Sequence, residues 1–261
     1  MACYGKGFIV SLPLFSQTLL GCRKQRARHT FQKASYLAQD IEKTLIKRLP
    51  KNRENLNRIL IIGCPAGLPQ IHLKGVVIDV FDPFLGERFV ENNLPFQDNH
   101  YDLILEGFVF HWLNDPLGYL RDIKRLLKSG GLYLSGFLGG TTLTEMRQAL
   151  LKTDIDLYGG AFARVSPMIK PEAATRLLQS AGFKDAVVDH EEIGVSYPRI
   201  KALIQDLRAM GESNALRDQR SPKISKDYFE RAQQNYFSLF PQKDDTLVAT
   251  FDLVHMIGWS S

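Results

Sequence analysis

Cysteines are scarce in this sequence, and no long apolar run occurs. Cys3, Cys22 and Cys64 are too few and too scattered for a disulfide framework, and they form neither a CxxC pair nor a Cys/His metal spacing. No stretch approaches the ~20 apolar residues that a membrane-spanning helix needs. Repeats and low-complexity segments are also missing. These absences argue against a disulfide-stabilised module and a membrane-spanning protein, and they predict no metal site.

The charge is unevenly spread along an otherwise ordinary globular composition. The 261 residues suffice for one large domain, with or without a helical extension. Residues 1–58 contain twelve Lys and Arg against three Asp and Glu, whereas the rest of the chain has a small acidic excess. Such a basic arm favours contact with an acidic partner, lipid head groups or nucleic acid. The alternative is a solvated helix face.

Alternating strand and helix patterns in the first half predict a mostly parallel sheet. Apolar residues recur at helical spacing over residues 23–49, and Pro50 ends that helix. Short apolar runs predict strands at residues 58–62, 76–80, 102–105 and 132–137, with a helix at 116–127 that ends before glycine.

The pattern changes after Gly140. Helices are predicted at residues 141–157, 171–181, 200–210 and 226–239, and strands at 182–188 and 246–259. We therefore expect an α/β fold in two parts. Residues 1–52 form a basic helical arm, and residues 53–261 form a sheet domain with helical insertions.

A glycine-containing turn follows the first predicted strand. Gly63 and Gly67 flank Cys64-Pro65-Ala66, and glycines at such a turn let the backbone approach a nucleotide or adenosyl group closely. Asp79 lies at the end of the next strand, where a carboxylate can accept hydrogen bonds from ribose hydroxyls. Asp82 is a rival for that role. The alternative for the glycines is an ordinary strand-to-loop turn.

Several longer segments resemble the class I S-adenosylmethionine (SAM) methyltransferases. The matching segments are Leu94-Pro95-Phe96, Tyr101-Asp102-Leu103-Ile104-Leu105, His111-Trp112-Leu113-Asn114-Asp115 and residues 126–131. Later segments resemble the group that methylates malonyl thioesters in biotin synthesis, together with its complex I assembly-factor branch. These are residues 139–147, 159–167, 197–198, 210–214 and 257–259. The likeness spans roughly residues 14–259.

The resemblance implies a Rossmann-like, seven-stranded sheet with flanking helices and SAM at the carboxyl ends of the first two strands. It implies either methylation of a malonyl thioester carboxylate or modification of an arginine in a complex I subunit. The expected partners are a protein or carrier-bound substrate and an acidic partner for the basic arm, with nucleic acid disfavoured. The expected location is the bacterial cytoplasm. The mitochondrial matrix is the alternative, because the arm has no acidic residue before Asp40.

Candidate site residues follow from these motifs. His111 is a candidate general base that Asp115 orients. The favoured alternative is structural, with His111 packing against the following helix and Asp115 capping it. Further candidates on the substrate side are Glu145, Arg147, Tyr197, Glu212 and Asn214, and the resemblance favours the cluster at Glu212 and Asn214. The alternatives are pairing with solvent for Glu145 and Arg147 and core packing for Tyr197. The candidate cofactor residues are Gly63, Cys64, Gly67, Asp79 and Glu106. SAM itself carries the chemistry, so the protein chiefly orients and shields it.

The cofactor segment departs from the family pattern. Ile61 stands where the family has an acid, Pro65 replaces the middle glycine, and only residues 68–75 separate Gly67 from the next strand. That stretch is too short for a crossover helix, because parallel neighbours need a connection of about a dozen residues. Either the strands pair differently, or the SAM pocket is partly missing.

Three functions are consistent with these features. The leading one is a SAM-dependent methyltransferase-type protein that acts on a carrier-bound acid or a protein side chain. The first alternative is a non-catalytic assembly protein that has lost SAM binding. The weaker alternative is a binder of nucleic acid or membrane surfaces through the basic arm.

Overall fold

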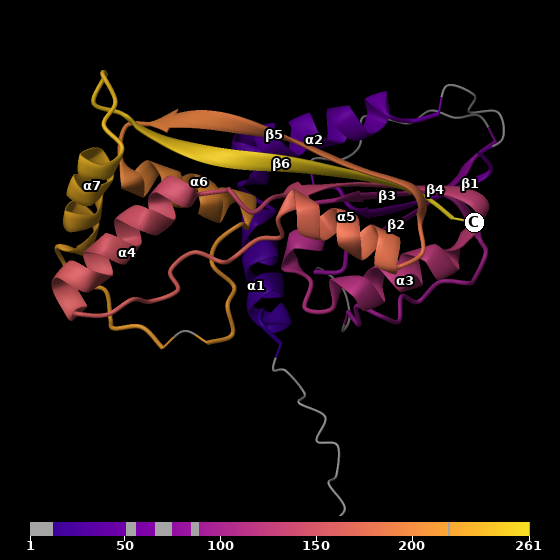
Figure 1. The fold of residues 1–261 in the computed structure, drawn as a ribbon, viewed down its shortest axis with the longest axis horizontal. Helices are drawn as coiled ribbons and strands as arrows, with labels where there is room; N and C mark the ends of the chain where they lie inside the picture. Colours follow the sequence, from indigo (N-terminus) through magenta and orange to yellow (C-terminus); the bar gives the residue numbers. More distant parts are fainter. Residues whose placement is uncertain (1–12, 51–55, 66–74, 85–88, 219, 261) are drawn as a thin grey trace, which may run out of the picture.

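A mixed sheet of six strands forms the centre of the fold (Figure 1). The computed structural model describes residues 13–50, 56–65, 75–84, 89–218 and 220–260. The strand order is β2-β1-β3-β4-β6-β5. The strands are β1 (Arg58–Gly63), β2 (Val77–Phe81), β3 (Tyr101–Gly107), β4 (Leu127–Leu138), β5 (Lys184–Tyr197) and β6 (Leu247–Trp259). The helices are α1 (Gln17–Ala27), α2 (Tyr36–Lys47), α3 (Pro116–Leu126), α4 (Thr144–Tyr158), α5 (Pro171–Ser180), α6 (Ile200–Met210) and α7 (Tyr228–Leu239), with short 3-10 turns at Phe31–Ala34 and Phe110–Trp112.

The first four strands form the parallel part of the sheet, as the sequence predicts. The apolar residues 59–62 of β1 are buried on both faces. Ile59 and Ile61 belong to the core under α2, and Leu60 and Ile62 belong to the core under α3 and α5. Helices therefore cover both faces of this part of the sheet (Figure 1), which explains why β1 is a continuous apolar run.

The observed pairing of β1 with β2 excludes one of the two explanations offered for the short connection between these strands. β2 pairs in parallel with β1, with Arg58 opposite Val77 and Ile62 opposite Phe81. The expectation that these strands pair differently is therefore wrong. Gly67 lies in the segment 66–74, outside the described residues.

The described residues form six strands, whereas the resemblance implies seven. β2 stands at the edge of the sheet, and residues 82–84 and 89–100, between β2 and β3, contain no strand. Aromatic side chains from this connection pack on the end of β2. The rings of Phe89 and Phe96 contact Phe81 at centroid distances of 6.3 and 5.5 Å.

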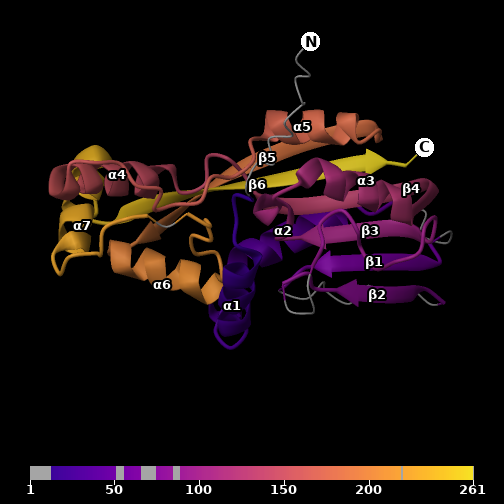
Figure 2. The same cartoon turned by 90° about the horizontal axis from the view of Figure 1, so that it is seen from below.

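The last two strands form a long antiparallel ribbon. The second half of β6, from Leu253 to Trp259, pairs with β4, while its first half pairs only with β5. The ribbon thus extends beyond the parallel strands, and α4, α6 and α7 gather around its far end (Figures 1 and 2). The strand predicted at 182–188 is only the start of β5. Its continuation escaped the pattern because most residues of this edge strand are solvent-exposed.

The helix predicted over residues 23–49 is in fact two helices. α1 ends at Ala27, a 3-10 turn follows, and α2 begins at Tyr36. The break lets Leu20 pack against Trp112 while Ile41 packs on the sheet. A Cβ atom on Gly136 would collide with the Ile41 side chain, so this close approach requires glycine in β4.

None of the helices in these described ranges is both long and apolar enough to cross a lipid bilayer.

Candidate functional site

A cavity of about 580 Å³ lies where α1, α4 and α6 meet residues 164–168 and 212–214. Much of its wall is apolar, including Met146, Leu150, Leu207 and Phe229. The charged and polar part includes Arg23, Arg26, Arg164, Arg208, Glu212 and Asn214. A concave, largely apolar site of this size with a few polar groups suits a small organic ligand or an inserted side chain.

Glu212 is the centre of a buried polar network at one side of the cavity. Its side chain is fully buried, and Oε2 accepts a hydrogen bond from Trp112 Nε1 and contacts His111 Nε2, both at 2.9 Å. Oε1 forms an ion pair with Lys24. Burial alone would raise the pKa of Glu212, but the charge of Lys24 and the contact with His111 lower it to about 2. Glu212 is therefore ionised at neutral pH.

The partner of His111 is Glu212 rather than Asp115. Burial lowers the pKa of His111, so the ring is neutral at neutral pH. Because an ionised Glu212 can only accept, Nε2 of His111 carries the proton, and Nδ1 has no partner among the described residues. His111 does not line the cavity, whereas Glu212 does.

Asp115 has a structural contact instead. It is the N-cap of α3, where its carboxylate accepts the backbone N–H of Gly118 at 2.9 Å. Pro116 occupies the first turn, which suits a position whose N–H has no partner within the helix. The Asp-Pro start of α3 thus corresponds to the capping alternative.

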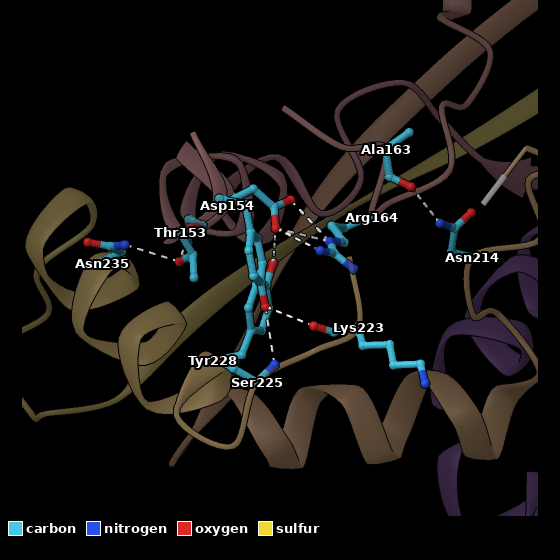
Figure 3. Close-up of polar contacts among 11 residues, drawn as sticks. Thr153, Asp154, Ala163, Arg164, Asn214, Lys223, Ser225, Tyr228 and Asn235 are labelled. Atoms are coloured by element: carbon cyan, nitrogen blue, oxygen red, sulfur yellow. Dashed lines mark hydrogen bonds and ion pairs between the residues drawn. The ribbon is translucent and has the colours of Figure 1, made fainter. Parts of the chain in front are cut away.

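Two of the substrate-side candidates line the cavity, namely Glu212 and Asn214. Asn214 holds the cavity wall together, because its Oδ1 accepts from Ser166 Oγ at 2.9 Å and its Nδ2 donates to the carbonyl of Ala163 at 2.7 Å. Figure 3 shows Asn214 reaching Ala163 across the gap between the two segments.

The other three candidates do not line this cavity. Glu145 accepts the backbone N–H of Thr250 at 3.0 Å and so fastens α4 to β6. Arg147 donates to the carbonyl of Thr142 at 3.3 Å. The hydroxyl of Tyr197 donates to Asp206 at 2.8 Å. Each of the three side chains is thus engaged in a contact within the protein.

The far side of the cavity is braced by a second network (Figure 3). Asp154 of α4 is fully buried and pairs with Arg164, whose Nη2 lies 2.9 Å from Oδ1. Tyr228 of α7 donates to the same oxygen at 2.9 Å. Asp154 therefore neutralises the one arginine on this side and joins α4 to α7.

The turn after β1 is packed tightly against the end of β3. Gly63 has φ +69°, and a Cβ atom there would collide with the carbonyl of Gly107 and with Val109. The N–H of Cys64 donates to that carbonyl at 3.0 Å, and burial raises the pKa of the Cys64 thiol. Glycine at position 63 is thus required by strand packing alone, whether or not a ligand binds at this turn.

The acidic cofactor candidates lie in different environments. Asp79 is inside β2, and its carboxylate accepts from the hydroxyl of Tyr101 at 2.9 Å. Asp82 directly follows β2 at the carboxyl edge, where it accepts the N–H of Phe84 at 2.9 Å. Since SAM is expected at that edge, Asp82 is better placed than Asp79 to meet a ribose.

Glu106 points into the core beneath α3. Its carboxylate accepts from the N–H of Phe110 at 2.9 Å, from the hydroxyl of Ser135 at 3.2 Å and from the hydroxyl of Tyr133. Burial raises the pKa of Glu106 to about 7, and these hydrogen bonds limit the rise. The contacts leave Glu106 inside the protein, below the carboxyl edge of β3.

The resemblance to methyltransferases is confirmed by comparison with known proteins. A family model described as a methyltransferase domain matches residues 84–135. The phosphoethanolamine N-methyltransferase 2 of Haemonchus contortus shares the fold with a TM-score of 0.52 at 15% identity, over 98% of this chain and 61% of that one. The fold and its matched segment define a class I, SAM-dependent methyltransferase-type protein.

Relatives of higher identity define the family. The mouse protein named arginine-hydroxylase NDUFAF5, mitochondrial, is 31% identical over 244 residues, which cover 87% of this chain and 71% of the mouse protein. The chain belongs to the methyltransferase-fold family that contains this protein. A malonyl-[acyl-carrier protein] O-methyltransferase of Xylella fastidiosa is 24% identical over 257 residues, covering 90% of this chain and 85% of that protein.

The class implies SAM as the cofactor, and the described residues fit it in part. The positive-φ turn at Gly63 and Cys64 and the carboxylate of Asp82 lie at the expected edge. Asp79 and Glu106 are engaged with tyrosine hydroxyls elsewhere. Gly67 stays a prediction, because its segment is not described.

The sequence patterns did not single out the arginines of the cavity. Arg23 and Arg26 come from α1, Arg208 comes from α6, and Arg164 comes from the segment between α4 and α5. The basic excess of residues 1–58 was the only signal, and it could not indicate which arginines converge, because α1 and α6 are far apart in the sequence.

Proposed function

We propose that this chain transfers a methyl group from SAM to a substrate that enters the 580 Å³ cavity. One observation carries the proposal. The Glu212 network joins His111 and Trp112, which lie in the 3-10 turn after β3, to the wall of the cavity. The expected cofactor edge and the cavity are thus connected by one buried polar cluster around the Lys24–Glu212 ion pair.

The protein's part in the reaction is to position and shield the reactants. When bound, SAM supplies an activated methyl group, so the side chains need only bind, orient and exclude water. The Gly63–Cys64 turn and Asp82 would hold the cofactor, and the cavity would hold the acceptor. The acceptor is a carrier-bound acid or a protein side chain, and the proposed location is the bacterial cytoplasm or the mitochondrial matrix.

A non-catalytic assembly role is the second candidate, and a specific observation favours it. Asp79, Glu106 and the N–H of Cys64 are all engaged in contacts within the protein. A site whose ligand groups are already occupied can retain its fold without binding SAM. The relative named as an arginine hydroxylase supports the view that this family is not restricted to methyl transfer.

A calorimetric titration with SAM separates the two functions. We expect SAM to bind the full chain, and Asp82→Ala to weaken binding about 10- to 100-fold, since a hydrogen bond to a charged group contributes about 1.5–3 kcal/mol. Asp79→Asn is the matched control and should bind SAM like the wild type, because Asp79 contacts Tyr101.

Two results would count against this reading. No heat and no thermal shift at millimolar SAM would rule out the methyltransferase and favour the assembly role. A loss of affinity in Asp79→Asn but not in Asp82→Ala would assign the ribose contact to Asp79. Circular dichroism of both variants shows whether each still folds.

A further inference from the structure

Three arginines on one side of the cavity have no acidic partner among the described residues. Arg23, Arg26 and Arg208 all line it, and none forms a hydrogen bond or ion pair through its side chain with a described residue. Nη1 of Arg23 is buried and unpaired. A buried guanidinium nitrogen without a partner is costly, and an oxyanion is the partner that its geometry matches.

The other charges at the cavity are already balanced. Arg164 is paired with Asp154 on the opposite side, and Glu212 is paired with Lys24. Burial lowers the pKa of Arg23, and the charges of Arg26 and Arg208 lower it further, so both neighbouring charges act on Arg23. The uncompensated charge at this site is therefore positive.

The rest of the wall determines the shape of the ligand. Met146, Leu150 and Leu207 are buried apolar residues, and Ile204 and Phe229 continue the same surface. A strongly hydrated anion such as free sulfate would leave this surface unused. A ligand that combines an apolar chain with a terminal oxyanion satisfies both parts of the cavity.

We propose that Arg23, Arg26 and Arg208 form an oxyanion subsite that binds the carboxylate or phosphate end of an apolar chain lying along Met146, Leu150 and Leu207. The subsite makes the cavity selective for an anion and excludes a guanidinium, because a fourth positive charge beside three unpaired arginines is repelled. The inference rests on the proposed function only in treating this cavity as the acceptor site.

The test uses the full chain without SAM and three probes with the same eight-carbon tail, octanoate, octyl phosphate and octylguanidinium. Calorimetry is expected to show that at least one anion binds ten or more times more tightly than octylguanidinium. The tighter of the two anions identifies the headgroup as a carboxylate or a phosphate. Equal or tighter binding of octylguanidinium, or no binding of either anion, overturns the proposal.

Matched arginine variants locate the subsite. Arg23→Gln is expected to weaken binding of the anion about 10- to 100-fold, and Arg23→Gln with Arg208→Gln to abolish it. Arg28→Gln is the control, because Arg28 follows α1 in the same basic segment but does not line the cavity. An equal loss in Arg28→Gln would show general attraction to the basic arm and would overturn the proposal.

Two further measurements separate loss of the subsite from loss of the positive charge alone and from loss of SAM binding. Arg23→Lys retains the charge, so it should restore part of the affinity if Arg23→Gln still folds but does not bind. The SAM titration is independent of these probes. Loss of SAM binding with retained anion selectivity would refute the methyltransferase, while normal SAM binding without anion selectivity would refute the subsite.

Discussion

Glu212→Gln is expected to destabilise the folded protein by about 3–5 kcal/mol, the range for removing one partner of a buried ion pair. The side chain of Lys24 is only 10% exposed, and its sole carboxylate partner among the described residues is Glu212. The amide that replaces the carboxylate also turns a donor toward Lys24, or toward His111 and Trp112. Urea unfolding at pH 7 measures the loss.

The variant Lys24→Met with Glu212→Gln is the matching control. Removing the unpaired cation should recover a substantial part of the stability, because the cost of Glu212→Gln lies mainly in a buried, uncompensated charge. A single-variant loss below about 1 kcal/mol, or a double variant no more stable than Glu212→Gln, would show that the network contributes little.

The Glu212 network also makes the stability of the folded protein depend on pH. The folded-state pKa of Glu212 is lowered from 4.5 to about 2. Its contribution to stability is therefore present above about pH 4.5 and is lost as the pH falls toward 2. Acid unfolding of Glu212→Gln should lack this component, so the stability difference between wild type and variant should shrink over that window.

Glu106→Gln is expected to stabilise the protein at alkaline pH. Burial raises the pKa of Glu106 from 4.5 to about 7, so holding it ionised costs about 3 kcal/mol above that pH. The sign follows from the raised value: the folded state binds the proton more tightly, and wild-type stability falls as the pH rises from 4.5 through 7. A neutral amide carries no such cost.

Urea unfolding at pH 5 and pH 8 tests the Glu106 prediction. The wild type should lose stability between the two values relative to Glu106→Gln. Glu191→Gln, at an exposed position of the edge strand β5, is the control and should follow the wild type. Parallel pH profiles for wild type and Glu106→Gln would contradict an ionised, buried carboxylate at this position.

The sequence predicted helices and strands best where apolar residues recur at a regular spacing. The helix at 200–210 coincides with α6, and the strand at 246–259 corresponds to β6. The prediction failed at β5, which is exposed along most of its length, and at residues 28–35, where the chain turns between α1 and α2. In β5 only Ile193, Val195 and Tyr197, near its end, alternate toward the core under α2. The turn between α1 and α2 carries no local signal strong enough to separate it from the helical repeat on either side.

The candidate site residues were likewise predicted only in part. The resemblance pointed to His111, Glu212 and Asn214 as separate motifs, and the fold brings Glu212 onto His111 and Asn214 onto the same cavity. Asp115, which is near His111 in the sequence, caps α3 instead. Adjacent residues beyond a strand can point in different directions, so sequence proximity could not choose the partner of His111.

By itself the sequence determined the parallel sheet, the family and the altered turn after β1, since these depend on local apolar runs, glycines and motifs. Only the tertiary structure decided that Asp82 follows β2 at its carboxyl edge while Asp79 lies inside the strand, that Glu106 faces the core, and that Arg23, Arg26 and Arg208 line one cavity. The physical reason is distance along the chain. Charges on separate helices act on one another only after the fold has brought those helices together.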